Sequence, residues 1–191
     1  THRRTFDSSR RCGVGPRSPD DTMLKTAVIG ASGYIGGHLW RSYRRAFPDC
    51  VGTRFSSAAL DLQRFDICDP KVAPLRLEET GHQAVLLASA RSSIAYCQRE
   101  PSAAYAVNVK GTLDLVRELG RTSLQVIFLS SDYVFEGSSG AYDDDAPTGP
   151  TTEYGRQKEL VEKEIPSLVE NSLILRLSKV YGLQKKDGTL L

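Results

Sequence analysis

A tyrosine and a lysine four residues apart, Tyr154 and Lys158, are the side chains in this sequence best suited to acid–base chemistry. At that spacing they lie on one face of a helix and can act together. Reduction of a ketone by hydride leaves negative charge on oxygen, so a proton donor must lie beside it. An ammonium group near a tyrosine favours the phenolate, so we expect Lys158 to lower the pKa of Tyr154 from its usual value near ~10. The alternative is that this common spacing marks a solvated helix face.

A serine supplies a hydroxyl for the same chemistry. Ser131 follows Leu124–Leu129, the clearest strand pattern in the chain. A hydroxyl at this place would polarise a carbonyl group or hold the developing oxyanion. We therefore predict that Ser131, Tyr154 and Lys158 form a catalytic set.

A glycine-rich turn, Gly30-Ala-Ser-Gly-Tyr-Ile-Gly36, follows the strand pattern Lys25–Ile29 and opens a helix pattern. Glycines let the chain turn tightly and let its backbone approach a pyrophosphate, while the helix N-terminus offers free N–H groups and a positive dipole. This strand–turn–helix context predicts a dinucleotide-binding turn, and the alternative is a plain strand-to-helix connection. The residues expected to contact the cofactor here are Gly30, Ser32, Gly33, Tyr34, Ile35 and Gly36.

The second strand pattern is Cys50–Phe55, and the residues at its end indicate which nicotinamide cofactor is bound. Proteins that bind NAD usually carry an acid here, which bonds to the ribose hydroxyls, and this sequence has Gly52-Thr53-Arg54 instead. An arginine can pair with a 2′-phosphate. We therefore predict NADP as the cofactor, with NADPH preferred over NADH. The alternative is that Arg54 is a solvated charge at a strand end.

These residues must be positioned by the apolar runs and helix patterns that alternate along the chain. Further strand patterns are Phe65–Ile67, Ala84–Ala88 and Leu173–Leu177. Helix patterns are residues 34–46, part of Pro70–Thr80, Ala103–Leu119 and Tyr154–Ile165, the last stopped by Pro166, and residues 136–151 read as an exposed loop. The alternation predicts an α/β fold with a Rossmann-type, doubly wound parallel sheet and helices on both faces. In such a sheet, ligands bind at the carboxyl ends of the strands.

Composition restricts the class of protein. The 191 residues are 40% hydrophobic and 25% charged, as in an ordinary globular chain. The net charge of +2 arises in residues 1–22, and the neutral remainder predicts no nucleic-acid partner. No apolar run approaches the ~20 residues that span a bilayer, so no membrane partner is expected. Four cysteines without a CxxC pair predict neither a disulfide framework nor a metal site, and they favour a reducing, cytoplasmic location.

The first 22 residues are rich in arginine and serine, and we expect them to form a disordered tail. A transit peptide is the alternative, but three acids and the lack of an amphipathic stripe disfavour it. Met23 directly precedes the first strand pattern, as it would if the natural chain began there. Residues 23–191 are then the expected NAD(P)-binding Rossmann domain.

In combination, the motifs resemble those of the extended short-chain dehydrogenases/reductases, and more specifically the sugar-nucleotide-binding family of dTDP-4-dehydrorhamnose reductase. The glycine turn has the GxxGxxG form of the larger group, and Tyr154–Lys158 is its YxxxK pair. Ser130–Gly137 (SSDYVFEG), Leu175–Gly182 (LRLSKVYG) and Cys97–Thr112 are similar to segments of the reductases. The resemblance runs from about Lys25 to Gly182.

The resemblance implies roles for further residues. A helix asparagine supports the catalytic lysine through water in relatives, an acidic-apolar pair flanks the adenine, and a segment after the fourth strand lines the cofactor. The residues that match these positions are Asn108, Asp66 and Ile67, and Ala88, Ser89 and Ala90, respectively. The implied reaction is the NADPH-dependent reduction of a nucleotide-linked 4-keto-6-deoxy sugar, as in dTDP-rhamnose biosynthesis, with Tyr154 as proton donor.

Two features depart from the family pattern. Members run on by roughly 100 residues, the length of one more small domain, so we expect the C-terminal substrate domain to be largely missing from this chain. Ser131 stands where the reductases usually have threonine, although the hydroxyl is kept. The SSDYVF form also resembles the non-catalytic, NADP-binding regulatory subunit of methionine adenosyltransferase, so a regulatory module is the alternative function. The sugar, its nucleotide carrier and the oligomeric state stay open, with a homodimer as one alternative.

Overall fold

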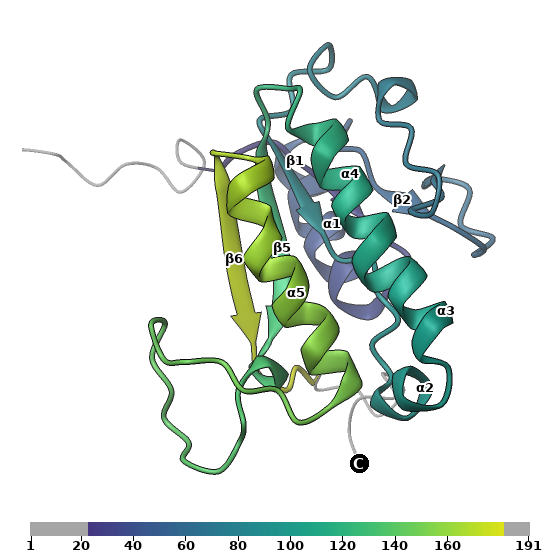
Figure 1. The fold of residues 1–191 in the computed structure, drawn as a ribbon. Coiled ribbons are helices and arrows are strands. Elements are labelled where there is room, and N and C mark those ends of the chain that lie inside the picture. Colours follow the sequence, from purple (N-terminus) through teal and green to yellow (C-terminus); the bar gives the residue numbers. More distant parts are fainter. Residues whose placement is uncertain (1–22, 182–191) are drawn as a thin grey trace, which may run out of the picture.

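The computed structural model describes residues 23–181, in which a parallel sheet lies between two layers of helices (Figure 1). Four strands pair in the order β1-β4-β5-β6, with bounds Thr26–Ile29, Ala84–Leu87, Gln125–Ser131 and Ser172–Leu177. A two-stranded sheet pairs β2, Thr53–Arg54, with β3, Gln63–Arg64. A parallel bridge between Val28 and Gly52 joins it to β1. The order across both sheets is therefore β3-β2-β1-β4-β5-β6, which reverses between β1 and β4 as in a doubly wound fold.

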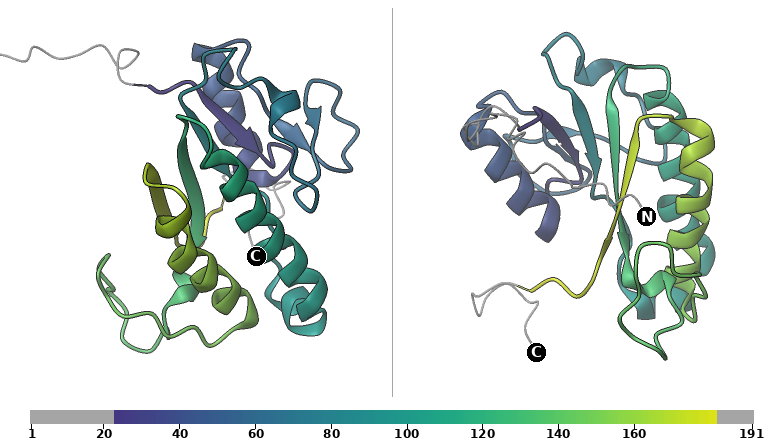
Figure 2. Two further views of the ribbon diagram at one scale, coloured as in Figure 1. Left: turned by 45° about the horizontal axis from the view of Figure 1, so that its top comes forward. Right: turned by 90° about the vertical axis from the view of Figure 1, so that its left-hand side faces the viewer.

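Helices cover both faces of the sheet (Figure 2). The helix α1, Tyr34–Ala46, lies on one face. On the other face, α3 (Pro101–Tyr105), a π-helical segment (Ala106–Gly111) and α4 (Thr112–Leu119) form one continuous rod beside α5 (Glu153–Leu168), and the short α2 (Ile94–Arg99) precedes α3. Successive residues of a strand point to opposite faces. Ile127 of β5 accordingly packs in the α1 layer, and its neighbour Phe128 packs in the layer of α4 and α5.

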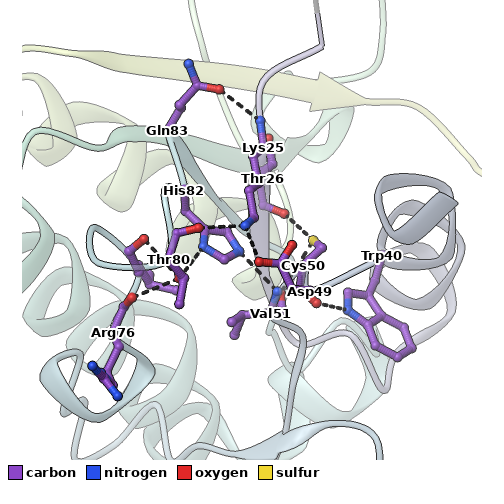
Figure 3. Close-up of polar contacts among 11 residues, drawn as sticks. Lys25, Thr26, Trp40, Asp49, Cys50, Val51, Arg76, Thr80, His82 and Gln83 are labelled. Atoms are coloured by element: carbon purple, nitrogen blue, oxygen red, sulfur yellow. Dashed lines mark hydrogen bonds and ion pairs between the residues drawn. The ribbon is translucent and has the colours of Figure 1, made fainter. Parts of the chain in front are cut away.

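A polar network around the buried His82 ring holds the amino ends of β1, β2 and β4 together (Figure 3). The His82 Nε2 atom accepts a hydrogen bond from the Val51 backbone N–H at 3.1 Å, so Nδ1 must carry the ring proton and donate to Thr80 Oγ1 at 2.9 Å. The Lys25 ammonium donates to Asp49 and to the Thr80 carbonyl oxygen, each at 2.6 Å. Since these bonds join three segments distant in sequence, the network fixes how β2 and β4 enter the sheet.

Most of the expected elements are confirmed. The helix over residues 34–46 has the expected bounds, the strands at Lys25–Ile29, Ala84–Ala88 and Leu173–Leu177 differ by one residue, and residues 136–151 contain neither helix nor strand. The expected helix Ala103–Leu119 begins earlier and includes the π-helical segment, in which Thr112 Oγ1 donates to the Val107 carbonyl oxygen at 3.3 Å. The expected tail, residues 1–22, and residues 182–191 of the expected domain lie outside the described residues.

Three expectations about elements are wrong. Phe65–Ile67 is not a strand, because β3 ends at Arg64 and the buried side chains of Phe65 and Ile67 enter the core from an irregular segment. Pro70–Thr80 contains a single 3₁₀ turn, Ala73–Leu75, which ends at Arg76 in the left-handed region with φ 49°. Pro166 does not stop α5, since it costs one hydrogen-bond donor in the last turn and the helix still closes through Val169 N–H and the Ile165 carbonyl oxygen.

Strand β6 forms the outer edge of the sheet in the described part of the chain. Its side chains alternate, so Ile174 packs against the core while Leu173 and Leu175 are 43% and 37% exposed. Within residues 23–181, no helix combines the length and the hydropathy that crossing a bilayer requires.

Candidate functional site

Two adjoining cavities open at the carboxyl ends of the strands. The first, named here the β2 cavity, has a volume of about 410 Å³ and is lined by the glycine turn, the end of β2 and the segments after β3 and β4. The second, the β5 cavity, has a volume of about 420 Å³ and is lined by the start of α1, the end of β5 and α5. Gly33, Ala88 and Ala90 line both cavities, so together they form one continuous depression across the sheet.

The structure brings nearly all of the predicted site residues to these two cavities. The β5 cavity collects Ser131, Tyr154 and Lys158 together with Tyr34, Ile35 and Gly36. The β2 cavity collects Gly30, Ser32, Arg54, Asp66, Ile67 and Ser89. Asn108 lines neither cavity.

The glycine turn brings α1 very close to β1. Gly30 has a φ of +91°, a left-handed conformation that glycine adopts without strain. A β-carbon on Gly36 would lie 2.3 Å from the Gly30 carbonyl oxygen, so only glycine permits this approach. No side chain caps the start of α1 at Gly33. The first N–H groups of α1 therefore remain available to an anion.

Tyr154 is positioned by the way α5 begins. Thr152 caps the helix, its Oγ1 accepting from the Gly155 N–H at 3.0 Å. A β-carbon on Gly155 would lie 2.1 Å from the Tyr133 carbonyl oxygen, so glycine lets α5 pack directly on the turn after β5. The rings of Tyr133 and Tyr154 consequently meet edge to face with their centroids 6.2 Å apart.

The pKa of Tyr154 is raised, and the expectation that Lys158 lowers it is wrong for this structure. Burial is the main cause and raises the pKa of Tyr154 to about 12. The Lys158 ammonium lies 5.8 Å from the centre of the Tyr154 ring and donates to the Leu129 carbonyl oxygen at 2.7 Å instead. At neutral pH the phenol is therefore uncharged and holds the proton that a general acid must give.

Lys158 is a buried cation with one strong hydrogen bond. Its side chain also lies over the Phe128 ring, with the ammonium 4.4 Å from the ring centre. Burial lowers the pKa of Lys158 to about 8, because the charged form is poorly solvated there. The ammonium form still predominates at neutral pH.

The two serines at the end of β5 differ in their hydrogen bonds. Ser131 Oγ donates to Asp132 Oδ1 at 3.1 Å and accepts from the Tyr133 N–H at 3.3 Å, capping a 3₁₀ turn, Asp132–Val134. Ser130 also lines the β5 cavity, but its Oγ atom is buried and has no partner among the described residues. A buried hydroxyl without a partner is costly, and the sequence analysis did not single out Ser130. The doubled serine was the available signal.

Asn108 connects segments behind the cavities. Its Oδ1 accepts from the Arg91 N–H at 2.7 Å, and its Nδ2 donates to the Arg91 carbonyl oxygen at 3.0 Å and to Gln157 Oε1 at 2.8 Å. These bonds hold the segment after β4 against α5. The expected support of Lys158 through water stays a prediction.

Arg54 and its neighbours shape the β2 cavity. Arg54 Nε donates to the Leu62 carbonyl oxygen at 3.2 Å, and Asp66 Oδ1 accepts from the Cys68 N–H at 2.9 Å. Phe55 lines the same cavity although it is 52% exposed, and the sequence analysis did not single it out. An aromatic residue directly after Arg54, at a strand end of a predicted nucleotide-binding sheet, was a usable signal for an adenine-stacking surface.

Comparison with known proteins gives concordant matches. A family model described as RmlD substrate binding domain matches residues 24–189. The spore coat polysaccharide biosynthesis protein SpsK of Bacillus subtilis is 31% identical over 84% of this chain and 54% of its own length. The dTDP-4-dehydrorhamnose reductase of Aggregatibacter actinomycetemcomitans is 30% identical over 84% of this chain and 53% of its own length. Methionine adenosyltransferase 2 subunit beta of Xenopus tropicalis is 23% identical over 85% of this chain and 50% of its own length.

A solved structure agrees with the fold. The crystal structure of a hypothetical dTDP-4-dehydrorhamnose reductase from Sulfolobus tokodaii superposes with a TM-score of 0.69 at 26% identity, covering 82% of this chain and 56% of that chain. The chain thus spans about half the length of the curated relatives that it matches.

Proposed function

The chain belongs to the RmlD substrate binding domain family, and from this premise we propose that the protein is an NADP-dependent reductase of a nucleotide-linked sugar. One observation carries the proposal. Ser131 at the end of β5, and Tyr154 and Lys158 on α5, line a single cavity that also includes the glycine turn. A hydroxyl, a neutral phenol and a buried ammonium beside a dinucleotide-type turn are the groups that carbonyl reduction needs.

A nicotinamide dinucleotide suits the two cavities. The uncapped start of α1 and the close-packed glycine turn are adapted to a pyrophosphate. Arg54, Asp66 and Ile67 would hold the adenosine end in the β2 cavity, and the β5 cavity would hold the nicotinamide end. Ala88 and Ala90, which line both cavities, would contact the middle of the cofactor. When bound, the reduced cofactor supplies the hydride.

The residues of the β5 cavity then manage charge and protons. Tyr154 donates its phenol proton to the carbonyl oxygen of the sugar as that oxygen becomes an alkoxide, a stronger base than the tyrosinate left behind. Ser131 would hold the same oxygen while its charge develops. Lys158, charged at neutral pH, adds positive charge to the cavity in which the alkoxide develops.

The substrate proposal is a 4-keto-6-deoxy sugar on a nucleotide carrier, reduced with NADPH in preference to NADH. It is supported by two relatives at 30% and 31% identity whose names specify dTDP-4-dehydrorhamnose reductase and polysaccharide biosynthesis. We propose residues 23–191 as the NAD(P)-binding domain of this reductase. The second candidate is a non-catalytic regulatory module, which the 23% identical methionine adenosyltransferase subunit favours. The presence of Ser131, Tyr154 and Lys158 in one cavity supports the enzyme over the module.

The test is NADPH oxidation by the full-length protein with a dTDP-4-keto-6-deoxy sugar. We expect turnover, and we expect Tyr154→Phe to lower kcat by about 10²- to 10⁴-fold, the usual contribution of a general acid. NADPH affinity should change little, since the ring is kept. Tyr105→Phe, at a 46% exposed position on α3, is the matched control and should leave kcat unchanged. Tight NADPH binding without any turnover would instead support the regulatory module.

A further inference from the structure

The segment after β4 connects the two halves of the proposed cofactor site. Ala88 and Ala90 line both the β2 and the β5 cavity, and Arg91 lines the β2 cavity. Tyr154 and Lys158 reach the β5 cavity from α5, which is a separate element. The distance between this segment and α5 therefore decides how a bound cofactor lies relative to the proton donor.

One buried side chain of α5 has no part in the proposed reaction so far. Gln157 lies between Tyr154 and Lys158 in the sequence, and only 1% of its surface is exposed. Its Oε1 atom accepts a hydrogen bond from Asn108 Nδ2 at 2.8 Å. Its Nε2 atom donates to Glu153 Oε1 at 2.9 Å. Both ends of the amide thus have partners, as a buried polar group requires.

The backbone of Arg91 determines how the two amides are oriented. The Arg91 N–H can only donate, so the Asn108 atom that it contacts at 2.7 Å must be Oδ1. The two N–H groups of Asn108 Nδ2 then bond to the Arg91 carbonyl oxygen at 3.0 Å and to Gln157 Oε1. Gln157 must in turn direct its Nε2 group toward Glu153. A chain of hydrogen bonds therefore runs from the Arg91 backbone through two amides to α5.

The π-helical segment gives an independent sign that this region serves the site. Short π-helical turns within α-helices occur frequently at functional sites. Asn108 lies in this segment, and so does Gly111, where a β-carbon would lie 2.5 Å from the Ile67 carbonyl oxygen. Ile67 lines the β2 cavity. The π-helical segment thus contacts two of the segments that line the cavities, one through Asn108 and the other through Gly111.

We infer that Gln157 is a positioning residue, which holds the segment after β4 at a fixed distance from Tyr154 and Lys158. This inference rests on the proposed function. Gln157 lines neither cavity, so it acts through Asn108 and does not touch the substrate. A leucine at this position would fill a similar volume but leave Asn108 with one acceptor fewer. The cofactor would still bind at the glycine turn, while the reacting groups would meet in a less favourable geometry.

The first experiment compares the full-length protein with Gln157→Leu and with a matched control, Gln83→Leu. Gln83 also accepts a backbone hydrogen bond, from the Lys25 N–H at 3.2 Å, but it lies at the amino end of β4, away from the cavities. We expect Gln157→Leu to lower kcat about 10- to 100-fold and to change the dissociation constant of NADPH less than about threefold. Gln83→Leu should change neither. An NADPH affinity that falls in step with kcat would overturn the inference, because it would indicate general damage to the fold.

Gln157→Glu provides a readout that a loss of stability would not give. Burial and the neighbouring Glu153 carboxylate favour the protonated form of the new side chain, which can accept from Asn108 and donate to Glu153 as the amide does. We expect the kcat of this variant, relative to that of the wild type, to approach one near about pH 6 and to fall about tenfold toward pH 8. A ratio near one at both pH values would overturn the inference.

Hydrogen exchange tests the same contact without a substrate. Asn108 protects the Arg91 N–H, so the exchange rate of this N–H measures how firmly the segment is held. We expect Gln157→Leu to speed this exchange about tenfold and Gln83→Leu to leave it unchanged. An unchanged exchange rate in Gln157→Leu overturns the inference, whatever happens to kcat. Failure of the proposed reaction looks different, because the sugar is then not reduced while the exchange of the Arg91 N–H still depends on Gln157.

Discussion

At the scale of single residues, burial shifts the two titratable groups of the β5 cavity in opposite directions. The pKa of Tyr154 is raised to about 12 and that of Lys158 is lowered to about 8, because in each case the charged form is the one that loses solvation. Both groups nevertheless carry their protons at neutral pH. The cavity can thus donate a proton, as a reduction requires. As pH rises, Lys158 loses its proton before Tyr154 does.

Lys158 therefore predicts the alkaline limit of the proposed reduction. As pH rises through about 8, the ammonium is lost and the cavity loses the positive charge that stabilises the developing alkoxide, so kcat should fall. Lys158→Met should have a low kcat that no longer changes across this pH. The measurement is the pH profile of kcat at saturating NADPH, from neutral to alkaline conditions. A wild-type profile that stays flat well above pH 8 would contradict this role.

The site residues differ in how far the sequence could predict them. Tyr154, Lys158 and the glycine turn could be located because fixed spacings place them on one helix face or at one strand end. The unpaired state of Ser130 could not, since whether a hydroxyl has a partner depends on packing between distant segments. The predicted direction of the Tyr154 pKa shift was wrong, because the spacing of two residues does not show whether they are buried.

At the scale of elements, the network around His82 links β2 and β4 through a neutral ring (Figure 3). Burial, followed by the charge of Lys25, lowers the pKa of His82 below 6.5. Protonation would place a second N–H against the Val51 N–H and break that bond. The unfolded chain therefore binds the proton more readily than the folded chain.

This difference predicts stability that depends on pH. Because the folded pKa is lowered, the contribution of His82 is fully present above about pH 6.5 and is lost as pH falls below it. The urea midpoint should be lower at pH 5 than at pH 7. His82→Gln should flatten this part of the pH dependence and, if the Val51 N–H is left unpaired, cost about 1–3 kcal/mol at pH 7. His38→Gln, at an exposed position on α1, is the control and should keep the wild-type slope.

Sequence patterns predicted the bounds of some elements and failed for others. The helix α1 has a clear apolar face and was predicted with its bounds. Strand β3 has two exposed residues, Gln63 and Arg64, and forms through backbone bonds to β2, so no apolar run marks it. The buried Phe65 and Ile67 that follow gave a false strand signal. Apolar side chains indicate that a segment is buried, but they do not indicate a strand, because an irregular segment can also bury its apolar side chains.

At the scale of the whole molecule, strand order determines where a ligand can bind. The order β3-β2-β1-β4-β5-β6 reverses between β1 and β4, and the crevice outside their carboxyl ends is the expected ligand site of a doubly wound sheet. Both the β2 and the β5 cavity lie at this place, since they share Gly33 after β1 and Ala88 after β4. This part of the architecture was predictable because alternating strand and helix patterns permit few topologies.

The exposed leucines of β6 have a consequence for handling the chain in solution. An edge strand offers a row of free N–H and C=O groups, and apolar side chains beside it favour edge-to-edge pairing and aggregation. Leu173 and Leu175 are 43% and 37% exposed on this edge. We expect light scattering to rise with protein concentration, and Leu175→Lys to reduce that rise severalfold, whereas Leu60→Lys, at a 94% exposed loop position, should leave it unchanged. A wild-type chain that stays monomeric at every concentration, as judged by sedimentation, would show that this edge is harmless during purification and storage.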